Sequence, residues 1–136
     1  MPDSDCLFCK IVAGEIPAVK VHEDEMTVAF MDLNPGTRGH LLVVPREHVA
    51  DIHAITETDL GAVARTAQRM AGRIVERLGA DGVNVIQNSG AAAWQSVLHY
   101  HVHVVPRYQD DPLRLPWTPA PGDPDEIAAV AKELSA

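Results

Sequence analysis

The sequence predicts an α+β fold with a largely antiparallel sheet. Only one segment of the 136 residues is long and has helical periodicity, and the other apolar segments are short and separated by turn residues. No strand–helix–strand unit repeats along the chain, so hairpin connections are expected rather than parallel crossovers. A chain of this length is expected to form one domain with its own core.

The N-terminal third predicts a short helix followed by three strands. Residues 7–13 form an apolar helical segment that ends at a glycine. Residues 18–23 and 26–31 are expected to pair as a hairpin, because acidic turn residues separate them. After a loop broken by proline and glycine, residues 40–45 form a nearly all-apolar run, typical of a strand buried on both faces.

One long amphipathic helix is expected next, with Thr58 as its N-cap and Gly79 at its end. Apolar residues recur at spacings of three and four and form one stripe: Leu60, Val63, Ala67, Met70, Ile74 and Leu78. Four arginines at four-residue spacing mark a solvated face rather than an anion-binding ridge: Arg65, Arg69, Arg73 and Arg77.

The last third predicts two more strands, at residues 83–86 and 97–105, the second ended by a proline. Residues 109–124 are rich in proline and have no periodicity, so they are expected to pack irregularly over a surface. Residues 125–134 fit a terminal helix whose apolar side consists of Ile127, Val130, Ala131 and Leu134. The chain therefore divides into a domain of residues 1–108 and an extension of residues 109–136.

Charge and hydropathy argue against two classes of partner. Eleven Lys and Arg residues against nineteen Asp and Glu residues give a net charge of -8 at pH 7, whereas nucleic acids are bound by basic faces. No apolar run approaches the roughly 20 residues that span a bilayer, and the polar N-terminus lacks the pattern of a signal peptide. We therefore expect a cytoplasmic protein that binds neither nucleic acid nor membranes.

Three of the seven histidines fall at alternate positions within five residues: His99, His101 and His103. On a strand they would share one face at a spacing of about 7 Å, and their β-branched neighbours favour a strand. An imidazole can attack phosphorus, leave again and exchange protons near neutral pH. The row therefore suits phosphoryl chemistry, and zinc coordination is the competing interpretation.

These histidines and their flanks resemble the signature of the histidine triad (HIT) family, in which His-x-His-x-His is followed by two apolar residues. The resemblance covers about residues 5–108. The segments that carry it occur in the same order as in the family, and they are Cys6–Ile11, Gly14–Pro17, Phe30–Leu33, Gly39–Pro45, Asn88 and Gln95–Arg107. The bacterial, Hint-like branch is the most similar. The resemblance implies an α+β fold with an antiparallel sheet of about five strands, a homodimer, and binding of nucleotides such as adenosine monophosphate.

The resemblance also implies catalytic roles. His101 would be the nucleophile that takes the nucleotidyl group, His103 would lie beside the phosphate and leaving group, and His40 would complete the set. Ser96 and Gln95 would contact phosphate and leaving-group atoms. Because related nucleotidyltransferases have glutamine at the third triad position, His103 favours a hydrolase, in which a second imidazole supplies and removes protons.

The same resemblance implies a nucleotide pocket. Asp32 would accept the ribose hydroxyls, and Asn88 would help to shape the pocket. The base would lie among apolar side chains, namely Phe8, Ile11, Ile16, Phe30 and Leu33. A turn role for Asp32 and Asn88, and a core role for the apolar residues, are the alternatives that need no ligand.

The expected activity is hydrolysis of nucleoside 5′-phosphate derivatives, phosphoramidates in particular, with a purine nucleotide preferred. Hydrolysis of dinucleoside polyphosphates, and nucleotide binding with little turnover, are the alternatives. Many family members have glycine where this chain has Trp94. Its indole would narrow the site, stack on a substrate, or pack against a dimer partner.

The two cysteines, Cys6 and Cys9, form one C-x-x-C motif, which suggests metal or redox chemistry in a protein without an export signal. Some bacterial relatives close a structural zinc site with such cysteines, a histidine after the second core strand, and the first histidine of the triad. The matching histidines here are His48 and His99, which would complete a tetrahedral Cys2His2 shell. Two buried, unligated thiols are the alternative. No organic cofactor is expected.

Overall fold

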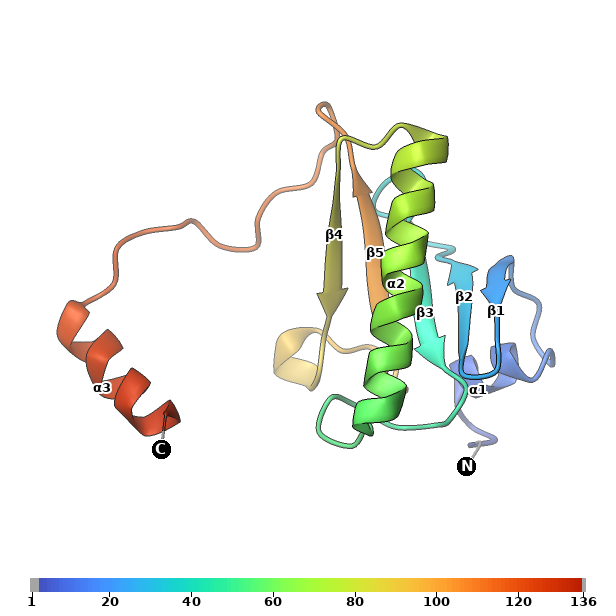
Figure 1. The fold of residues 1–136 in the computed structure, drawn as a ribbon, viewed down its shortest axis with the longest axis horizontal. Helices are drawn as coiled ribbons and strands as arrows, with labels where there is room; N and C mark the ends of the chain where they lie inside the picture. The colour runs from blue at the N-terminus through green and yellow to red at the C-terminus, as the bar shows by residue number, and fades with distance from the viewer. Residues whose placement is uncertain (1–2, 136) are drawn as a thin grey trace.

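The fold is described from a computed structural model that covers residues 3–135. Met1 and Pro2, the start of the polar N-terminus, lie outside that range, as does Ala136. The centre of the molecule is a five-stranded sheet with strand order β1-β2-β3-β5-β4, in which every neighbouring pair is antiparallel (Figure 1). The strands are β1 (Lys20–Glu23), β2 (Thr27–Met31), β3 (Leu41–Pro45), β4 (Gly82–Gln87) and β5 (Val102–Arg107). The predicted α+β class and antiparallel sheet are confirmed.

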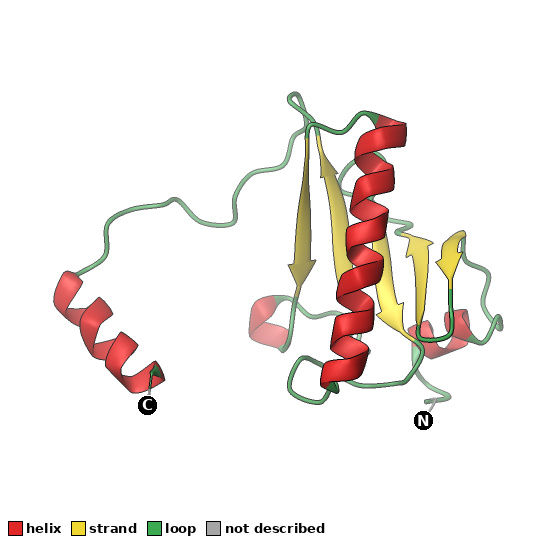
Figure 2. Cartoon of the chain, viewed as in Figure 1, coloured by secondary structure: helices red, strands yellow, loops and turns green. Residues whose placement is uncertain are grey.

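Three α-helices and one short 3₁₀ helix accompany the sheet (Figure 2). They are α1 (Leu7–Val12), α2 (Glu57–Leu78), η1 (Ala91–Ala93) and α3 (Pro124–Leu134). The helix α2 lies along one face of the sheet (Figure 1). The helix α1 packs against the opposite face, where its apolar residues meet Val28, Phe30, Leu42 and Val44. The sheet therefore separates two apolar clusters, one under each helix.

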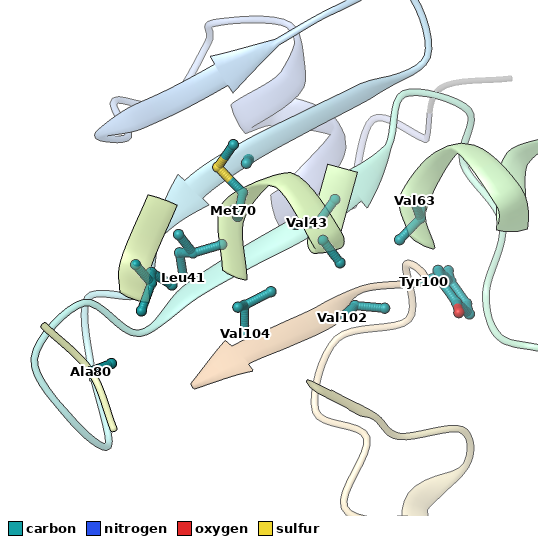
Figure 3. Close-up of a cluster of buried hydrophobic side chains, with 11 residues drawn as sticks. Leu41, Val43, Val63, Met70, Ala80, Tyr100, Val102 and Val104 are labelled. Carbon is teal, nitrogen blue, oxygen red and sulfur yellow. The ribbon is translucent and has the colours of Figure 1, made fainter. Parts of the chain in front are cut away.

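The core under α2 follows from the predicted apolar stripe. Figure 3 shows Val63 and Met70 of the helix above Leu41, Val43 and Val104 of the sheet. The helix begins two residues earlier than expected, because Thr56 rather than Thr58 is its N-cap. The Thr56 hydroxyl accepts a hydrogen bond from the Asp59 amide at 3.1 Å, which places Glu57 and Asp59 at the positive end of the helix dipole.

The last core strand differs from its prediction at both ends. It was expected to span residues 97–105, yet β5 begins at Val102, because the Tyr100 amide bonds the Val49 carbonyl outside the sheet. It also continues through Pro106, because the pairing with β3 ends at Val104 and leaves that side of the proline without a partner strand. The expected alternation survives, since Tyr100, Val102 and Val104 all enter the core under α2.

The prediction that the C-terminal segment packs over a surface is wrong beyond Leu113. Residues 114–123 are exposed and extended, and they carry α3 away from the rest of the chain (Figure 1). The helix α3 has nearly the predicted bounds, but its apolar side chains Ile127, Val130 and Leu134 are 59%, 41% and 82% exposed. Within residues 3–135, no helix is both long enough and apolar enough to cross a membrane.

Candidate active site

Sheet register brings the third histidine of the triad onto the face that α1 covers. Phe30 of β2 pairs with Leu42 of β3, and Leu42 pairs with His103 of β5. Because directly paired residues point to the same face, these three side chains form one row. Phe8 of α1 closes over the row, with its ring centroid 5.4 Å from that of Phe30 and 5.0 Å from that of His101.

This row borders a cavity of about 370 Å³ between α1, β2 and the segment before β5. Most of the predicted site residues line the cavity: Phe8, Ile11, Ile16, Phe30, Asp32, Leu33, Ser96, His101 and His103. The lining also includes residues that the sequence analysis did not assign to the site, among them Asn34 and Val97. The only sequence signal of these two is that they directly follow the predicted site residues Leu33 and Ser96. The cavity has the apolar walls and few convergent polar groups typical of a small-molecule site.

The backbone fixes the proton positions of His101. Its Nδ1 lies 2.7 Å from the His99 carbonyl oxygen, and a carbonyl can only accept, so Nδ1 must carry the proton. A neutral imidazole then has its lone pair on Nε2. Burial lowers the pKa of His101 below its usual value, which keeps the ring neutral. His101 is therefore a base or nucleophile through Nε2.

A second backbone group orders His40 and His103. The Gly36 amide donates to His40 Nδ1 at 2.9 Å, so neutral His40 carries its proton on Nε2. That Nε2 lies 3.0 Å from His103 Nδ1 and 3.4 Å from Asp32 Oδ2. His103 Nδ1 is thus an acceptor, and the His103 proton sits on Nε2. Burial, assisted by neighbouring His101 and His40, lowers the pKa of His103 to about 4, so His103 is a neutral hydrogen-bond donor near pH 7.

This proton order also bears on metal binding at Asp32, His40 and His103, whose ligand atoms lie close enough to share an ion. A metal on His40 Nε2 would need a lone pair there, yet Nδ1 already accepts from the Gly36 amide. An imidazole with both nitrogens deprotonated is not available near neutral pH. The three side chains therefore form a hydrogen-bonded relay. The Gly36 amide that sets this order had no side-chain signal in the sequence.

Three further predicted residues lie outside the cavity lining. His40 contacts the cavity through His103. The Gln95 side chain accepts from the Gly90 amide at 2.8 Å and donates to the carbonyls of Ala50 and Val97 at 2.7 and 3.0 Å. Gln95 therefore holds together the loop that carries Ser96. Asn88 lies at the end of β4, and its carbonyl accepts from the Gln87 side chain.

A second polar cluster lies beside the first, at the start of α1. Cys6, Cys9, His48 and His99 each bring a ligand atom within 4.8 Å of the others. Cys6 is the N-cap of α1 and Cys9 lies in its first turn, so the C-x-x-C spacing places both thiols at one helix end. The Nδ1 atoms of His99 and His48 lie 3.5 and 3.3 Å from Cys9 Sγ.

The proton order of this cluster fits a metal. His99 Nε2 lies 2.9 Å from the Pro45 carbonyl, so it carries the proton and leaves the Nδ1 lone pair toward both sulfurs. Tetrahedral zinc, with bonds of about 2.3 Å to sulfur and 2.0 Å to nitrogen, would hold S and N about 3.5 Å apart. The observed separations match. Burial lowers the pKa of His99 to about 4, so its imidazole is neutral near pH 7 and its Nδ1 lone pair is available to a cation.

Comparison with known proteins assigns the chain to a family. A family model described as the HIT domain matches residues 13–110. The chain belongs to the HIT family. Over 131 residues it is 36% identical to the adenosine 5′-monophosphoramidase hnt1 of Schizosaccharomyces pombe, with 96% of each chain covered.

Solved structures share this fold. A protein from Streptococcus mutans superposes with a TM-score of 0.92 at 39% identity, over 97% of this chain and 84% of the other. A zinc-bound histidine triad protein from Mycobacterium smegmatis superposes with a TM-score of 0.78 at 39% identity, over 95% of both chains. The HIT fold is therefore shared along nearly the whole chain.

Proposed function

We propose that this HIT protein hydrolyses nucleoside 5′-phosphate derivatives through a covalent nucleotidyl-histidine at His101. The observation that carries the proposal is the proton order of His101, whose Nδ1 proton is held by the His99 carbonyl while Nε2 is free at the cavity. A buried neutral imidazole with one free nitrogen is a competent nucleophile toward phosphorus. The similarity to an adenosine 5′-monophosphoramidase supports this substrate class.

The remaining residues suit the stages of such a reaction. The base would lie against the apolar side chains of the cavity, which include Phe8 of α1 and Phe30 of β2, and Asp32 would accept the ribose hydroxyls. His101 Nε2 attacks the α-phosphorus as the bond to the leaving group breaks, and the leaving group departs with that electron pair and takes up a proton from water at the cavity. The His103 Nε2–H and the Ser96 hydroxyl stabilise the charge that develops at phosphate and leaving group. Water then attacks the nucleotidyl-imidazole, which releases the nucleoside monophosphate and restores neutral His101.

The deciding experiment is hydrolysis of adenosine 5′-phosphoramidate by the wild type and by His101→Ala. We expect release of adenosine monophosphate that falls at least about a thousandfold in the variant. His53→Ala, which removes an exposed histidine outside the cavity, is the matched control and should keep full activity. A folded wild type that binds adenosine monophosphate but releases no product would instead indicate a nucleotide-binding module. Faster cleavage of a dinucleoside polyphosphate would favour that substrate class.

We also propose that zinc occupies the Cys6, Cys9, His48 and His99 cluster. The matching separations, the order of the His99 protons and the zinc-bound HIT relative support it. Four protein ligands would complete the tetrahedral shell, so the metal would be structural and would take no part in catalysis. We expect one zinc per chain by elemental analysis, with less in His48→Ala and no loss in His53→Ala.

A cytoplasmic homodimer is the remaining part of the proposal. The edge strand β4 exposes Val85 and Ile86 to 57% and 42%, and an unpaired edge with apolar side chains favours association. The free thiols of Cys6 and Cys9 suit a reducing compartment. Light scattering should give about twice the chain mass of 14.7 kDa, and a monomer at every concentration would contradict the dimer.

A further inference from the structure

Asp32 joins the nucleotide cavity to the buried histidine His40. Its side chain lines the cavity, and its Oδ2 lies 3.4 Å from His40 Nε2, behind the cavity wall. Its other oxygen, Oδ1, accepts a hydrogen bond from the Asn34 amide at 2.8 Å. A carboxylate oxygen has room for about two hydrogen bonds, so each oxygen of Asp32 has one place left. Asp32 can therefore hold a ligand hydroxyl in the cavity and remain beside His40.

The hydrogen on His40 Nε2 has two neighbours that attract it. The Gly36 amide donates to His40 Nδ1, which leaves the single hydrogen of the neutral ring on Nε2. His103 Nδ1 accepts it at 3.0 Å, and Asp32 Oδ2 lies at the longer distance of 3.4 Å. Burial lowers the pKa of His40 below its usual value, and the charge of Asp32 opposes that effect. The strength of the bond from His40 to His103 thus depends on what else Asp32 binds.

A ligand hydroxyl on Asp32 would shift this balance toward His103. A hydroxyl that donates to Oδ2 occupies its second lone pair and weakens its attraction for the His40 hydrogen, which then points fully at His103 Nδ1. An imidazole that accepts a stronger hydrogen bond at Nδ1 donates more strongly through Nε2, because hydrogen bonds in a chain polarise one another. His103 itself lines the cavity, so the effect reaches the place of the phosphate and leaving group.

We propose that the ribose hydroxyls of the substrate accelerate the chemical step through Asp32 and His40, which orient and polarise the donor His103. Asp32 and His40 are then positioning residues, and the hydrogen stays on His40 Nε2 throughout. The inference rests on the proposed hydrolase activity and goes beyond a binding role for Asp32. Its consequence is selectivity in rate, because a nucleotide without ribose hydroxyls would bind in the cavity and still react more slowly than the ribonucleotide.

Single-turnover kinetics of the full-length, zinc-loaded protein test the proposal. The substrates are adenosine 5′-phosphoramidate and its 2′,3′-dideoxy analogue, each fully bound by excess protein, so that the rate constant reports chemistry and not affinity. We expect the wild type to cleave the dideoxy substrate about three- to tenfold more slowly. His40→Ala should slow both reactions and make their rates nearly equal. Ser96→Ala, which changes a cavity residue outside this line of hydrogen bonds, is the matched control and should keep the wild-type ratio.

Two kinetic outcomes would overturn the proposal. Equal rates for the two bound substrates in the wild type would show that the ribose hydroxyls contribute to binding alone. A rate ratio in His40→Ala that equals the wild-type ratio would show that the hydroxyls act by a path that does not include His40.

A measurement without turnover separates this inference from the proposed activity. Nitrogen NMR of isotope-labelled histidine rings reports the hydrogen bond at His103 Nδ1 in the wild type. Adenosine monophosphate should shift the His103 Nδ1 signal toward that of a stronger hydrogen bond, whereas 2′,3′-dideoxyadenosine monophosphate, which carries the same phosphate, should leave it nearly unchanged. Equal shifts with both nucleotides, or none with either, would overturn the coupling. The expected shift in a protein that hydrolyses nothing would contradict the hydrolase and still support the path from ribose to His103.

Discussion

At single residues, main-chain groups determine the proton positions of His99, His101 and His40. The His99 carbonyl, the Gly36 amide and the Pro45 carbonyl have fixed donor or acceptor roles, and each orients one imidazole. The alternation His99, His101, His103 predicted that the three side chains share a face. The place of His99 beside the two thiols was expected from the family resemblance and not from the alternation. Neither could predict which nitrogen of each ring carries the proton, because this depends on backbone groups such as the Pro45 carbonyl and the Gly36 amide, which are distant in sequence.

The pH dependence of stability tests the state of His103. Burial lowers its pKa from 6.5 to about 4, so the unfolded state binds a proton first as the pH falls. The free energy of unfolding should therefore be independent of this group above about pH 6.5 and should decrease as the pH falls from there toward 4. His103→Gln removes this group, and denaturant titrations across that range should show a shallower decrease. Equal slopes in both proteins would mean that His103 protonates normally in the fold.

Trp94 is the only residue other than glycine with positive φ in the described part of the chain, at 70°. A left-handed conformation costs an L-residue about 1 kcal/mol or more, and the indole is 70% exposed, so little burial offsets that cost. Trp94→Gly should raise the unfolding midpoint by a few degrees. Trp94→Ala keeps the strained left-handed conformation, so it is the control, and its unfolding midpoint should not rise.

The same pair of variants resolves the role of the indole. If it contacts the substrate, both Trp94→Gly and Trp94→Ala should change kcat/KM for phosphoramidates with bulky leaving groups more than for the unsubstituted one. If the ratio of kcat/KM for bulky to unsubstituted phosphoramidates is unchanged in both variants, and their self-association constant is altered, the indole lies at the dimer contact instead.

Among the elements, α1 connects the two polar clusters. Its N-cap Cys6 and its first-turn residue Cys9 belong to the thiol cluster, whereas Phe8 and Ile11 of the same helix line the cavity beside His101. Removal of zinc with a chelator should therefore lower both the unfolding midpoint and the affinity for adenosine monophosphate. Calorimetry before and after chelation measures the two. In His48→Ala, which lacks one of the four ligands, chelation should change both quantities less. If chelation left the nucleotide affinity of the wild type unchanged, the position of α1 at the cavity would not depend on the zinc cluster.

The elements that sequence could predict are those whose pattern is local. The stripe on α2 and the apolar run of β3 appear with close to their expected bounds. The start of β5 could not be predicted, because the Tyr100 amide bonds Val49 rather than a neighbouring strand. The helix α3 was predicted from its periodicity, but its position was not, because residues 114–123, which precede it, are exposed and extended and have no periodicity that would indicate where they lead.

Across the whole molecule, the body ends later than the predicted boundary at residue 108. The Asp111 carboxylate accepts from the Arg107 guanidinium at 2.8 and 2.9 Å and from the Tyr108 amide at 2.8 Å. Arg107 also bonds Asn84 of β4 at 2.8 Å. Residues 109–113 are thus fastened to the edge of the sheet, and only the segment beyond them is free of the body.

Two truncations measure where the body ends. A chain that stops after Leu113 and one that stops after Tyr108 both lack α3, so any difference between them reports residues 109–113 alone. The shorter chain should unfold several degrees lower, because it loses the Asp111 carboxylate that joins Arg107 to the loop. It should also turn over more slowly, since a Cβ on Gly36 would lie 3.6 Å from Leu113, so Leu113 covers the residue whose amide orients His40. Equal midpoints and equal rates would show that the body ends at residue 108.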